Sequence, residues 1–440
     1  MSNRIIRRAG SAVLALVLAV LLAPGAATAQ PSPARGGPPE DLRIASFNVS
    51  MFRLTEGELA TDLADADDEE QDAEVRNVAE IVQRQRPEVL LLNEFDHDAK
   101  GSALKGFQDN FLAVGQGGAD PIDYPYAMVF ESNTGVASGF DLNNDGQVGE
   151  EGRAYGDDSF GFGVFPGQYA FAILSQHPID TDAARSFQEF RWADMPGALL
   201  PDDPGTPEPA DWYSPEELEA FRLSSKNHVD VPVIVNGGAV HVLASHPTPP
   251  SFDGPEDRNG TRNYDEIRFW ADYVSPGKRS DYIYDDDGEY GGLRAGSAFV
   301  VVGDLNADPA DDGNGIPGSA GQIVEHPLVR DPAPASDGAV EATELQGGTN
   351  ETHDGDPDLD TADFSDGPRS AGNLRVDYVL PSRPLRVQGS GVFWPVQEDP
   401  LFRLTGEYDP SFTNGFPSSD HRMVWVDLAV PPGGPSQQAR

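Results

Sequence analysis

Four apolar runs of the chain each carry polar groups at one end, and the types of these groups suit metal or phosphate chemistry. They are Asn48 after residues 44–47, Glu94 after residues 89–92, Asp304 and Asn306 after residues 299–302, and Asp420 with His421 before residues 423–426. Carboxylates and carboxamides offer oxygen ligands to hard cations, and imidazoles and carboxylates transfer protons. This repeated arrangement at the ends of apolar runs is the main sequence signal for function.

The elements that must position these groups begin with a strand, a helix and a second strand. Val75, Val78, Ala79 and Val82 have the i, i+3, i+4, i+7 spacing of an amphipathic helix, which should end before Pro87. Further short β-rich runs occupy residues 126–130, 169–174, 229–235, 240–244, 299–302, 376–380 and 423–428. Helical spacing returns at residues 264–274. Many short strands with few helices predict an α/β fold: a four-layer α/β sandwich of two packed mixed β-sheets flanked by helices.

Three long segments interrupt this pattern. Residues 196–216, 305–320 and 331–372 are acidic and rich in proline and glycine, which predicts loops or insertions and no separate domain. We therefore expect one domain over residues 42–430, although the length of 440 residues alone leaves the number of domains open.

The N-terminal residues have the pattern of a secretory signal peptide. Basic residues at positions 4, 7 and 8 precede an apolar run over residues 12–23 and then Ala27-Thr28-Ala29, so we expect a signal peptide over residues 1–29. The apolar run is shorter than the ~20 residues that span a bilayer, so no membrane span is expected after cleavage. The protein should be secreted and extracellular, with a flexible leader at 30–41 and a disordered tail at 431–440. The export route stays open.

The composition limits the chemistry further. The chain has no cysteine, which excludes disulfides, thiol nucleophiles and thiolate metal ligands. A metal must then be held by oxygen and imidazole ligands, which favours magnesium, manganese or calcium. The formal net charge of −43 argues against tight non-specific binding of nucleic acid.

Taken in order, the polar motifs resemble those of the endonuclease/exonuclease/phosphatase superfamily, whose members include DNase I-like nucleases, sphingomyelinases and inositol-polyphosphate phosphatases. The matching segments are Ser46-Phe47-Asn48, Leu92-Asn93-Glu94, residues 161–179, Ser245-His246-Pro247, Gly303-Asp304-Leu305-Asn306, Arg375-Val376-Asp377-Tyr378 and Ser419-Asp420-His421. Each motif alone is weak, but seven in the right order are specific. The resemblance covers residues 42–430.

The resemblance implies a role for each matching residue. Glu94, Asp420 and Asn48 would form the site of a catalytic Mg²⁺ or Mn²⁺. Asp304 would activate the attacking water and Asn306 would donate to phosphate oxygens, while Asp377 would hold the ring of His421 in one tautomer. His246 would stabilise or protonate the leaving oxygen. Turn capping is the alternative for Asn48 and Asp304, and an ion pair with Arg375 is the alternative for Asp377.

One stretch departs from the family pattern. Many family nucleases have an arginine on the strand before the histidine motif, whereas this chain has Ser224-Ser225-Lys226-Asn227-His228 there. Lys226 is the candidate phosphate contact, with His228 as the alternative. The departure leaves the substrate class open, because a lysine lacks the two-pronged donor geometry of a guanidinium.

A second signal lies between the motifs. Asp141, Asn143, Asp145 and Gln147, with Gly146 between the last two, fit the start of an EF-hand-type loop and predict a structural Ca²⁺ site. The loop departs from that pattern at its twelfth position, which is Gly152, and no flanking helices are expected. An acidic turn without a metal is the alternative.

The expectation is a secreted, metal-dependent phosphoesterase that hydrolyses phosphodiester or phosphomonoester bonds by direct attack of water and acts as a monomer. An extracellular DNase is one alternative, and a non-catalytic, calcium-dependent surface-binding protein on the same fold is another. Retention of all the metal, base and histidine motifs argues against the latter, since a binding module has no need of them. The sequence leaves the substrate open among nucleic acid, lipid headgroup, nucleotide and sugar phosphate.

Overall fold

The computed structural model describes residues 38–64, 73–311, 315–412 and 414–433. The predicted signal peptide, most of the predicted leader and residues 434–440 of the predicted tail lie outside these ranges. All described residues belong to one of the two units into which the chain divides, residues 37–440. Its first strand begins at Glu40, two residues before the expected start of the domain.

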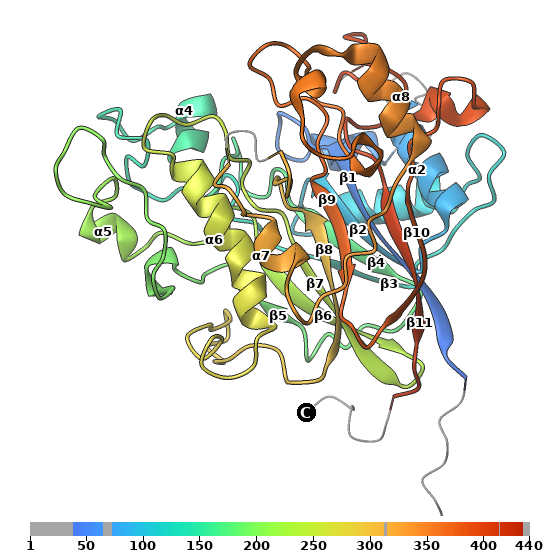
Figure 1. Cartoon of the computed structure of the whole chain (residues 1–440), viewed down its shortest axis with the longest axis horizontal. Helices are drawn as coiled ribbons and strands as arrows, with labels where there is room; N and C mark the ends of the chain where they lie inside the picture. The colour runs from blue at the N-terminus through green and yellow to red at the C-terminus, as the bar shows by residue number, and fades with distance from the viewer. Residues whose placement is uncertain (1–37, 65–72, 312–314, 413, 434–440) are drawn as a thin grey trace, which may run out of the picture. The chain divides into compact units, whose positions relative to one another are not determined.

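The first sheet has six strands in the order β10-β11-β1-β2-β4-β3 (Figure 1). They are β1 (Glu40–Met51), β2 (Val89–Phe95), β3 (Tyr126–Val129), β4 (Phe171–Ser175), β10 (Arg386–Val392) and β11 (Val424–Val430). The neighbours β1 and β2 are parallel and the other pairs are antiparallel.

The second sheet has five strands in the order β5-β6-β7-β8-β9. They are β5 (Arg185–Ser186), β6 (His228–Val235), β7 (Gly238–Ser245), β8 (Ala298–Asp304) and β9 (Asp377–Pro381). Here β7 and β8 are parallel and the other pairs antiparallel. Both sheets are therefore mixed, as predicted.

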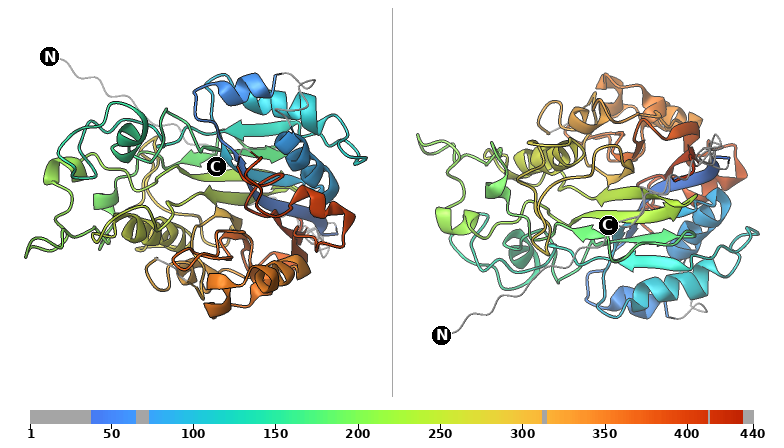
Figure 2. Two further views of the ribbon diagram at one scale, coloured as in Figure 1. Left: turned by 90° about the horizontal axis from the view of Figure 1, so that it is seen from above. Right: turned by 90° about the horizontal axis from the view of Figure 1, so that it is seen from below.

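The helices lie outside the sheets (Figure 2). The α-helices are α1 (Glu58–Asp62), α2 (Ala73–Gln85), α3 (Ser102–Gly106), α4 (Gly152–Asp157), α5 (Pro215–Leu218), α6 (Arg258–Tyr273), α7 (Gly321–Val324) and α8 (Asp337–Gln346). A π-helix, η1 (Phe107–Leu112), and the 3-10 helices η2 (Trp192–Asp194), η3 (Gly348–Thr352), η4 (Pro357–Leu359) and η5 (Pro400–Leu404) complete the set. Among the described helices, none combines the length and apolar character needed to span a bilayer.

Strand alternation divides the apolar residues of the two sheets among the three largest apolar clusters of the described residues. Leu42 and Ile44 of β1 pack between the two sheets with valines of β6, β7 and β8, and we call this cluster the inter-sheet core. Ala45, Phe47 and Val49 of the same strand point the other way and pack under α2. The outer face of the second sheet is covered by α6, through residues such as Ile267 and Trp270. Successive side chains of a strand point to opposite faces, so one strand serves two cores.

The predicted helix before Pro87 is confirmed as α2, and the helix predicted at 264–274 is α6, which starts six residues earlier. Two strands were not predicted, β5 and β10. The sequence of β10 holds Gly389 and Gly391 and few β-formers, and its position depends on packing, because a Cβ at Gly391 would lie 2.8 Å from the ring of Trp425. The segment 331–372, predicted as loops or an insertion, contains the helix α8, which the sequence analysis did not predict.

The start of α8 has a physical cause that the acidic composition conceals. The side chain of Ser336 accepts a hydrogen bond from the backbone N–H of Ala339, which caps the helix, and Asp337 lies in the first turn, where a negative charge is favourable.

Candidate active site

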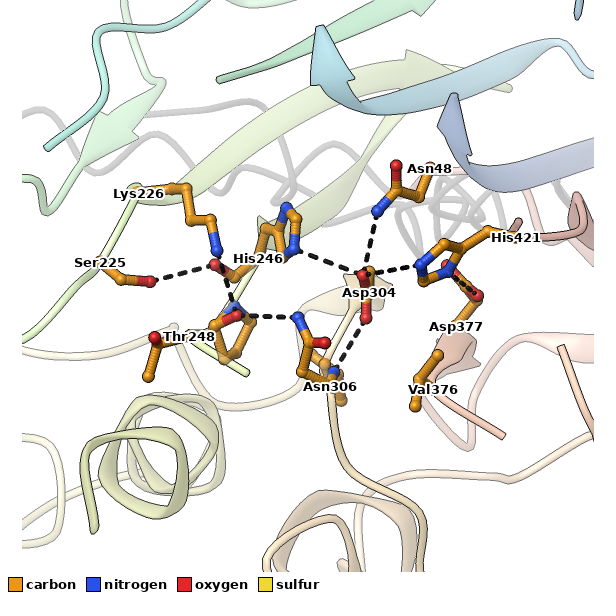
Figure 3. A network of polar contacts seen from close by, with 12 residues as sticks. Asn48, Ser225, Lys226, His246, Thr248, Asp304, Asn306, Val376, Asp377 and His421 are labelled. Atoms are coloured by element: carbon orange, nitrogen blue, oxygen red, sulfur yellow. Dashed lines mark hydrogen bonds and ion pairs between the residues drawn. The ribbon is translucent and has the colours of Figure 1, made fainter. Parts of the chain in front are cut away.

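The polar end of the inter-sheet core brings the predicted residues together. Asn48, His246, Asp304 and Asp377 each lie an even number of residues from a neighbour in that core, namely Ile44, Ala244, Val302 and Val379 respectively. Strand alternation therefore directs all four side chains into the space between the sheets. In Figure 3, Asn48 and His246 point to Asp304, and Asp377 contacts His421, which lies beside Asp304.

Asp304 is the centre of this group and is 1% exposed. Its Oδ2 accepts a hydrogen bond from Asn48 Nδ2 at 3.1 Å, lies 3.3 Å from His246 Nε2, and is 3.7 Å from His421 Nε2. Its Oδ1 accepts from the backbone N–H of Asn306 at 2.9 Å. Burial raises the pKa of Asp304, but His421 and His246 outweigh burial and hold the pKa well below its ordinary value. The carboxylate is therefore ionised at neutral pH.

Asp377 lies behind His421, as the sequence predicts. Its Oδ2 is 2.8 Å from His421 Nδ1 and also accepts a hydrogen bond from Thr361 Oγ1 at 3.0 Å. Burial raises the pKa of Asp377 to about 6, and His421 opposes that rise. Burial lowers the pKa of His421, but Asp377 and Asp304 raise it well above its ordinary value. One imidazole thus lies between two carboxylates, which favour its protonated form.

His246 differs from His421 in charge. Burial and the nearby ammonium group of Lys226 lower the pKa of His246 to about 4, so the ring is neutral at neutral pH. A neutral ring that donates its Nε2–H to Asp304 keeps Nδ1 as an acceptor. Nδ1 is buried and has no hydrogen-bond partner among the described residues.

Lys226 and Asn306 approach the centre from the second sheet. Both donate to the Pro247 carbonyl, Lys226 Nζ at 3.4 Å and Asn306 Nδ2 at 3.1 Å. Lys226 is buried, and burial lowers its pKa, while Glu266, Glu94 and Asp304 act in the opposite direction. The ammonium group therefore lies within the electrostatic reach of the centre, and its contact with phosphate stays a prediction.

Glu94 and Asp420 form the side that belongs to the first sheet. Burial and the nearby Asp420 carboxylate raise the pKa of Glu94 to about 7. Glu94 has a φ of 55°, a left-handed conformation that costs a glutamate ~1–3 kcal/mol. Ser50, with a φ of 48°, donates its Oγ–H to Asp420 Oδ1 at 3.0 Å. The Glu94 carboxylate at the end of β2 thus lies near the Asp420 carboxylate, which precedes β11, and the left-handed residues Glu94 and Ser50 are both part of this side.

Residues 45–421 match the model of the Endonuclease/Exonuclease/phosphatase family. The chain belongs to this family. The prediction from the motifs is confirmed, and membership supports a hydrolase of the phosphodiesterase, nuclease or phosphatase type. Members of the endonuclease/exonuclease/phosphatase family generally use divalent metal ions.

Solved structures of low identity are similar to the chain over most of its length. An endonuclease/exonuclease/phosphatase from Beutenbergia cavernae DSM 12333 is 16% identical with a TM-score of 0.43, over 89% of this chain and 72% of that chain. A family protein from Leptotrichia buccalis C-1013-b is 13% identical with a TM-score of 0.43, over 88% and 99% respectively. A beta toxin from Staphylococcus aureus is 15% identical with a TM-score of 0.39, over 88% and 99%. None of the curated proteins matches the sequence.

The donors on the first-sheet side fit a divalent cation of the kind this family uses. Glu94 and Asp420 repel each other, which is the cause, after burial, of the raised pKa of Glu94, and a cation between them would remove that repulsion. Asn48 adds an amide beside Glu94 that favours its charged form. Carboxylate and amide oxygens without thiolates suit Mg²⁺ or Mn²⁺.

A second group of donors could also hold a metal ion. One ligand atom from each of Asp304, Asp377 and His421 lies within 4.8 Å of the others, and this is the one such group of acidic or histidine side chains in the described part of the chain. Hydrogen bonding explains their closeness, since His421 Nδ1 is 2.8 Å from Asp377. The structure thus offers two neighbouring candidate cation sites. In the group of Asp304, Asp377 and His421 the side chains already bond to one another, whereas Glu94 and Asp420 repel each other.

One predicted site residue lies elsewhere. His228 is fully buried beside the rings of Phe269 and Trp270, and its ring nitrogens contact Ser224 Oγ at 2.6 Å and the Glu266 carbonyl at 2.9 Å. The prediction of a phosphate contact was therefore wrong for His228. The physical reason is strand alternation, because Val229 and Val231 point into the inter-sheet core and His228 points to the opposite face.

Sequence reasoning missed two residues near the centre. Tyr169, before β4, lies close enough to Glu94 that burial and Glu94 together raise the pKa of the phenol above its ordinary value. Glu266 of α6 is fully buried and accepts hydrogen bonds from Ser225 N at 2.6 Å and Thr248 N at 2.7 Å. The signal for Glu266 was present, because a charged residue occurred on the apolar side of a predicted helix.

The predicted calcium loop is closed by its own side chains. Asp141 Oδ2 accepts from Gly146 N at 2.8 Å, and Asn143 Oδ1 accepts from Asp145 N at 3.0 Å. The expectation of no flanking helix was wrong, since α4 begins at Gly152. The helix brings Asp158, a buried carboxylate that accepts hydrogen bonds from three backbone N–H groups of the loop. The calcium site itself stays a prediction.

Proposed function

We propose that this protein is a secreted, metal-dependent phosphoesterase that cleaves phosphodiester or phosphomonoester bonds by direct attack of water. The observation that carries the proposal is the position of Asp304. Its ionised carboxylate lies between His246 and a protonated His421, and it belongs to the same centre as two carboxylates that repel each other. Proton transfer, positive charge and oxygen ligands are thus assembled in one place, as hydrolysis of a phosphoester requires.

Asp304 has the geometry to hold the attacking water. Its low pKa keeps it ionised, so it accepts a hydrogen bond from water over the whole physiological pH range. Three donors already converge on this carboxylate, which fixes its position before substrate binds. Such pre-organisation lowers the cost of orienting water at the moment of reaction.

Three side chains face the phosphate in this proposal: His421, which precedes β11 of the first sheet, and Asn306 and Lys226 from the second-sheet side. His421, protonated between two carboxylates, donates its Nε2–H to a phosphoryl oxygen. The amide of Asn306 donates one N–H to Pro247 and has a second for phosphate, and Lys226 adds positive charge. His246 is neutral at neutral pH and donates its one N–H to Asp304, so in this proposal it positions the Asp304 carboxylate.

Glu94, Asp420 and Asn48 would hold the divalent metal. When bound, Mg²⁺ or Mn²⁺ would polarise a phosphoryl oxygen and neutralise the charge of the transition state. The test is hydrolysis by the purified protein of bis-p-nitrophenyl phosphate, p-nitrophenyl phosphate, plasmid DNA and sphingomyelin, each with Mg²⁺, Mn²⁺ or Ca²⁺ and with EDTA. We expect metal-dependent cleavage of at least one substrate. A folded protein that cleaves none of the four with any of the metals would refute the proposal.

Secretion is a separate part of the proposal and rests on the N-terminal pattern alone. Cleavage after Ala29 would give a mature protein that begins at Gln30. N-terminal sequencing of protein from a culture supernatant tests this directly, and a protein retained in the cell with Met1 intact would contradict it.

A further inference from the structure

A cavity of about 410 Å³ opens beside the candidate centre. Three aromatic side chains and three site residues are among those that line it: Phe52, Tyr408, Phe412, Glu94, Asp420 and His421. Its volume lies within the range of sites that bind small molecules, ~300–1,000 Å³. The reacting phosphate would therefore sit directly next to an aromatic cavity, which the family motifs do not include.

Two of the aromatic side chains that line the cavity, Phe52 and Tyr408, pack against neighbouring residues. The ring of Phe52 packs on the ring of Tyr169, with centroids 4.6 Å apart. The ring of Tyr408 lies on Gly415, where an added Cβ would come within 2.5 Å of it, and edge-on to Phe416 at 6.0 Å. Tyr408 is nevertheless 69% exposed. A large aromatic face is thus held in place while remaining open to solvent.

The loop that carries Tyr408 is also tied to the candidate metal side. The Asp409 N–H donates to the Gly415 carbonyl at 2.8 Å, which closes the loop, and the Asn414 amide donates to the Ser50 carbonyl. Ser50 in turn donates to the Asp420 carboxylate. The aromatic wall and the metal-binding carboxylates therefore share one backbone anchor, so the distance between them is fixed by the fold.

The chemistry of the lining selects its occupant. Among the residues that the structure describes, no lysine or arginine lines the cavity, so these residues offer no charge complement to a second phosphate. Glu94 and Asp420 are assigned to a divalent metal, which leaves no negative charge for a cationic headgroup. What the cavity offers are the faces and edges of aromatic rings, which bind flat aromatic groups by stacking.

We propose that this cavity binds a planar aromatic group of the substrate, such as a nucleobase or aryl group, with Tyr408 and Phe412 as the specificity-determining residues. The inference rests on the proposed function, since it places the scissile phosphate at Asp304. It restricts the substrate to phosphoesters that carry an uncharged, planar aromatic group able to reach the cavity beside the phosphate. Acyl chains, sugar polyphosphates and choline esters would then be poor substrates.

The test measures binding and is independent of turnover. Phenylphosphonate, cyclohexylphosphonate, ethylphosphonate and phosphocholine are titrated into the Mg²⁺-loaded protein by calorimetry. Stacking on an aromatic side chain contributes enough that we expect phenylphosphonate to bind about ten-fold more tightly than ethylphosphonate. Cyclohexylphosphonate has the size of phenyl without its flat face, so it should bind like the ethyl compound.

Variants assign the effect to the rings. Tyr408→Ala and Phe412→Ala should each remove most of the preference for phenyl, and Tyr408→Phe should keep it. Gly415→Ala should reduce it without removing a ring, because the new methyl group displaces Tyr408. Tyr290→Ala is the matched control, since Tyr290 is 70% exposed and does not line the cavity. It should bind all four ligands like the wild type.

The outcomes separate the two proposals. Equal affinities for phenyl- and cyclohexylphosphonate, tighter binding of phosphocholine, or a phenyl preference that survives both alanine variants would overturn the assignment of the cavity. Preserved phenyl preference in a protein that hydrolyses no phosphoester would refute the proposed function instead. Absence of any phenylphosphonate binding at millimolar concentration would also overturn the proposal that the cavity binds an aromatic group.

Discussion

The two sheets contribute unlike halves to the candidate centre. The second-sheet half consists of Asp304, Asp377, His246 and Lys226, all at least nine-tenths buried. Most of its polar groups are hydrogen-bonded to one another or to neighbouring backbone. The first-sheet half consists of Glu94 and Asp420, partly exposed carboxylates that repel each other beside backbone of positive φ.

The difference shows which part of the centre the fold forms by itself and which part needs a bound cation. Opposite charges and hydrogen bonds within the protein stabilise the second-sheet half, so its geometry exists before substrate arrives. The first-sheet half concentrates like charge at the edge of an aromatic cavity, an arrangement that a cation completes. Substitutions in the second-sheet half should therefore lower activity at every metal concentration. Activity lost by substitutions in the first-sheet half should recover when the metal concentration is raised.

The largest effects should come from the second-sheet half and its contact with His421. Asp304→Ala and His421→Ala should each lower turnover by at least ~10²-fold, the scale of a positioned base or an electrostatic donor. Initial rates with the best substrate and circular dichroism of both variants are the measurements. Near-native rates in either folded variant would mean that the centre lies elsewhere.

Asp377→Asn should have the next largest effect. The amide cannot favour a protonated His421 as a carboxylate does, so we expect a loss of ~10–100-fold in activity with the fold intact. Because Asp377 acts through His421, the double variant with His421→Ala should be scarcely worse than His421→Ala alone. Losses that multiply would show that the two residues work independently, despite the 2.8 Å contact.

Glu94→Gln tests the other half of the comparison. Loss of one carboxylate should weaken Mg²⁺ binding, so activity should fall at low Mg²⁺ and recover at high Mg²⁺, whereas Asp304→Ala should not recover. Calorimetric titration of Mg²⁺ into both variants gives the affinity without turnover. Unchanged Mg²⁺ affinity in Glu94→Gln together with weakened affinity in Asp304→Ala would place the metal in the group formed by Asp304, Asp377 and His421.

A smaller effect should come from Glu266, which positions the second-sheet half. Its carboxylate joins the segments that carry Lys226 and His246, through Ser225 N and Thr248 N. Glu266→Gln replaces one acceptor oxygen by a donor and leaves a buried N–H unpaired, a cost of ~1–3 kcal/mol. We expect kcat to fall about ten-fold, on the scale of displaced supporting contacts.

Asp265 provides the matched control for Glu266. It is equally buried on the same helix but accepts from Trp192 Nε1 at 2.7 Å and Leu199 N at 2.6 Å, in loops that do not touch Asp304. Asp265→Asn should lower the melting temperature by a similar amount and leave kcat unchanged. Equal losses of kcat in the two variants would show that Glu266 acts only through stability.

The comparison also explains how far the sequence predicts the centre. Asp304, Asp377, Asn48 and His246 could be placed because the alternation of apolar residues in their strands fixes which face they occupy. The same rule applied to residues 229–235 would have excluded His228. Glu94 could not be placed this way, because strand alternation predicts that its side chain lies on the outer face of β2. Its backbone has a φ of 55° at the centre, and no local sequence pattern indicates this conformation.

Tertiary packing accounts for most of what the sequence did not predict in the fold. The strand β10 depends on Trp425 of another strand lying against Gly391, and the aromatic cavity depends on a loop closure that places Gly415 beneath Tyr408. By contrast, α2 and the central strands were predictable because their apolar spacing is local. Sites at strand ends are therefore easier to predict than the loops that determine specificity.

The smallest expected effect concerns the loop from Asp141 to Gly152, which lies far in sequence from the residues of both halves. Its backbone is already held by Asp158, so calcium should add stability rather than create the fold. At about ten times its Kd, Ca²⁺ bound only to the native state contributes ~1.4 kcal/mol, a rise of roughly 2–4 °C in the melting temperature. Asp141→Ala combined with Asp145→Ala should abolish that rise, and Glu94→Gln should keep it. Mg²⁺ should replace Ca²⁺ poorly, because it demands a compact octahedral site. A calcium-dependent shift that survives in the double variant but disappears in Glu94→Gln would assign the binding to the candidate active site and leave the loop as an acidic turn.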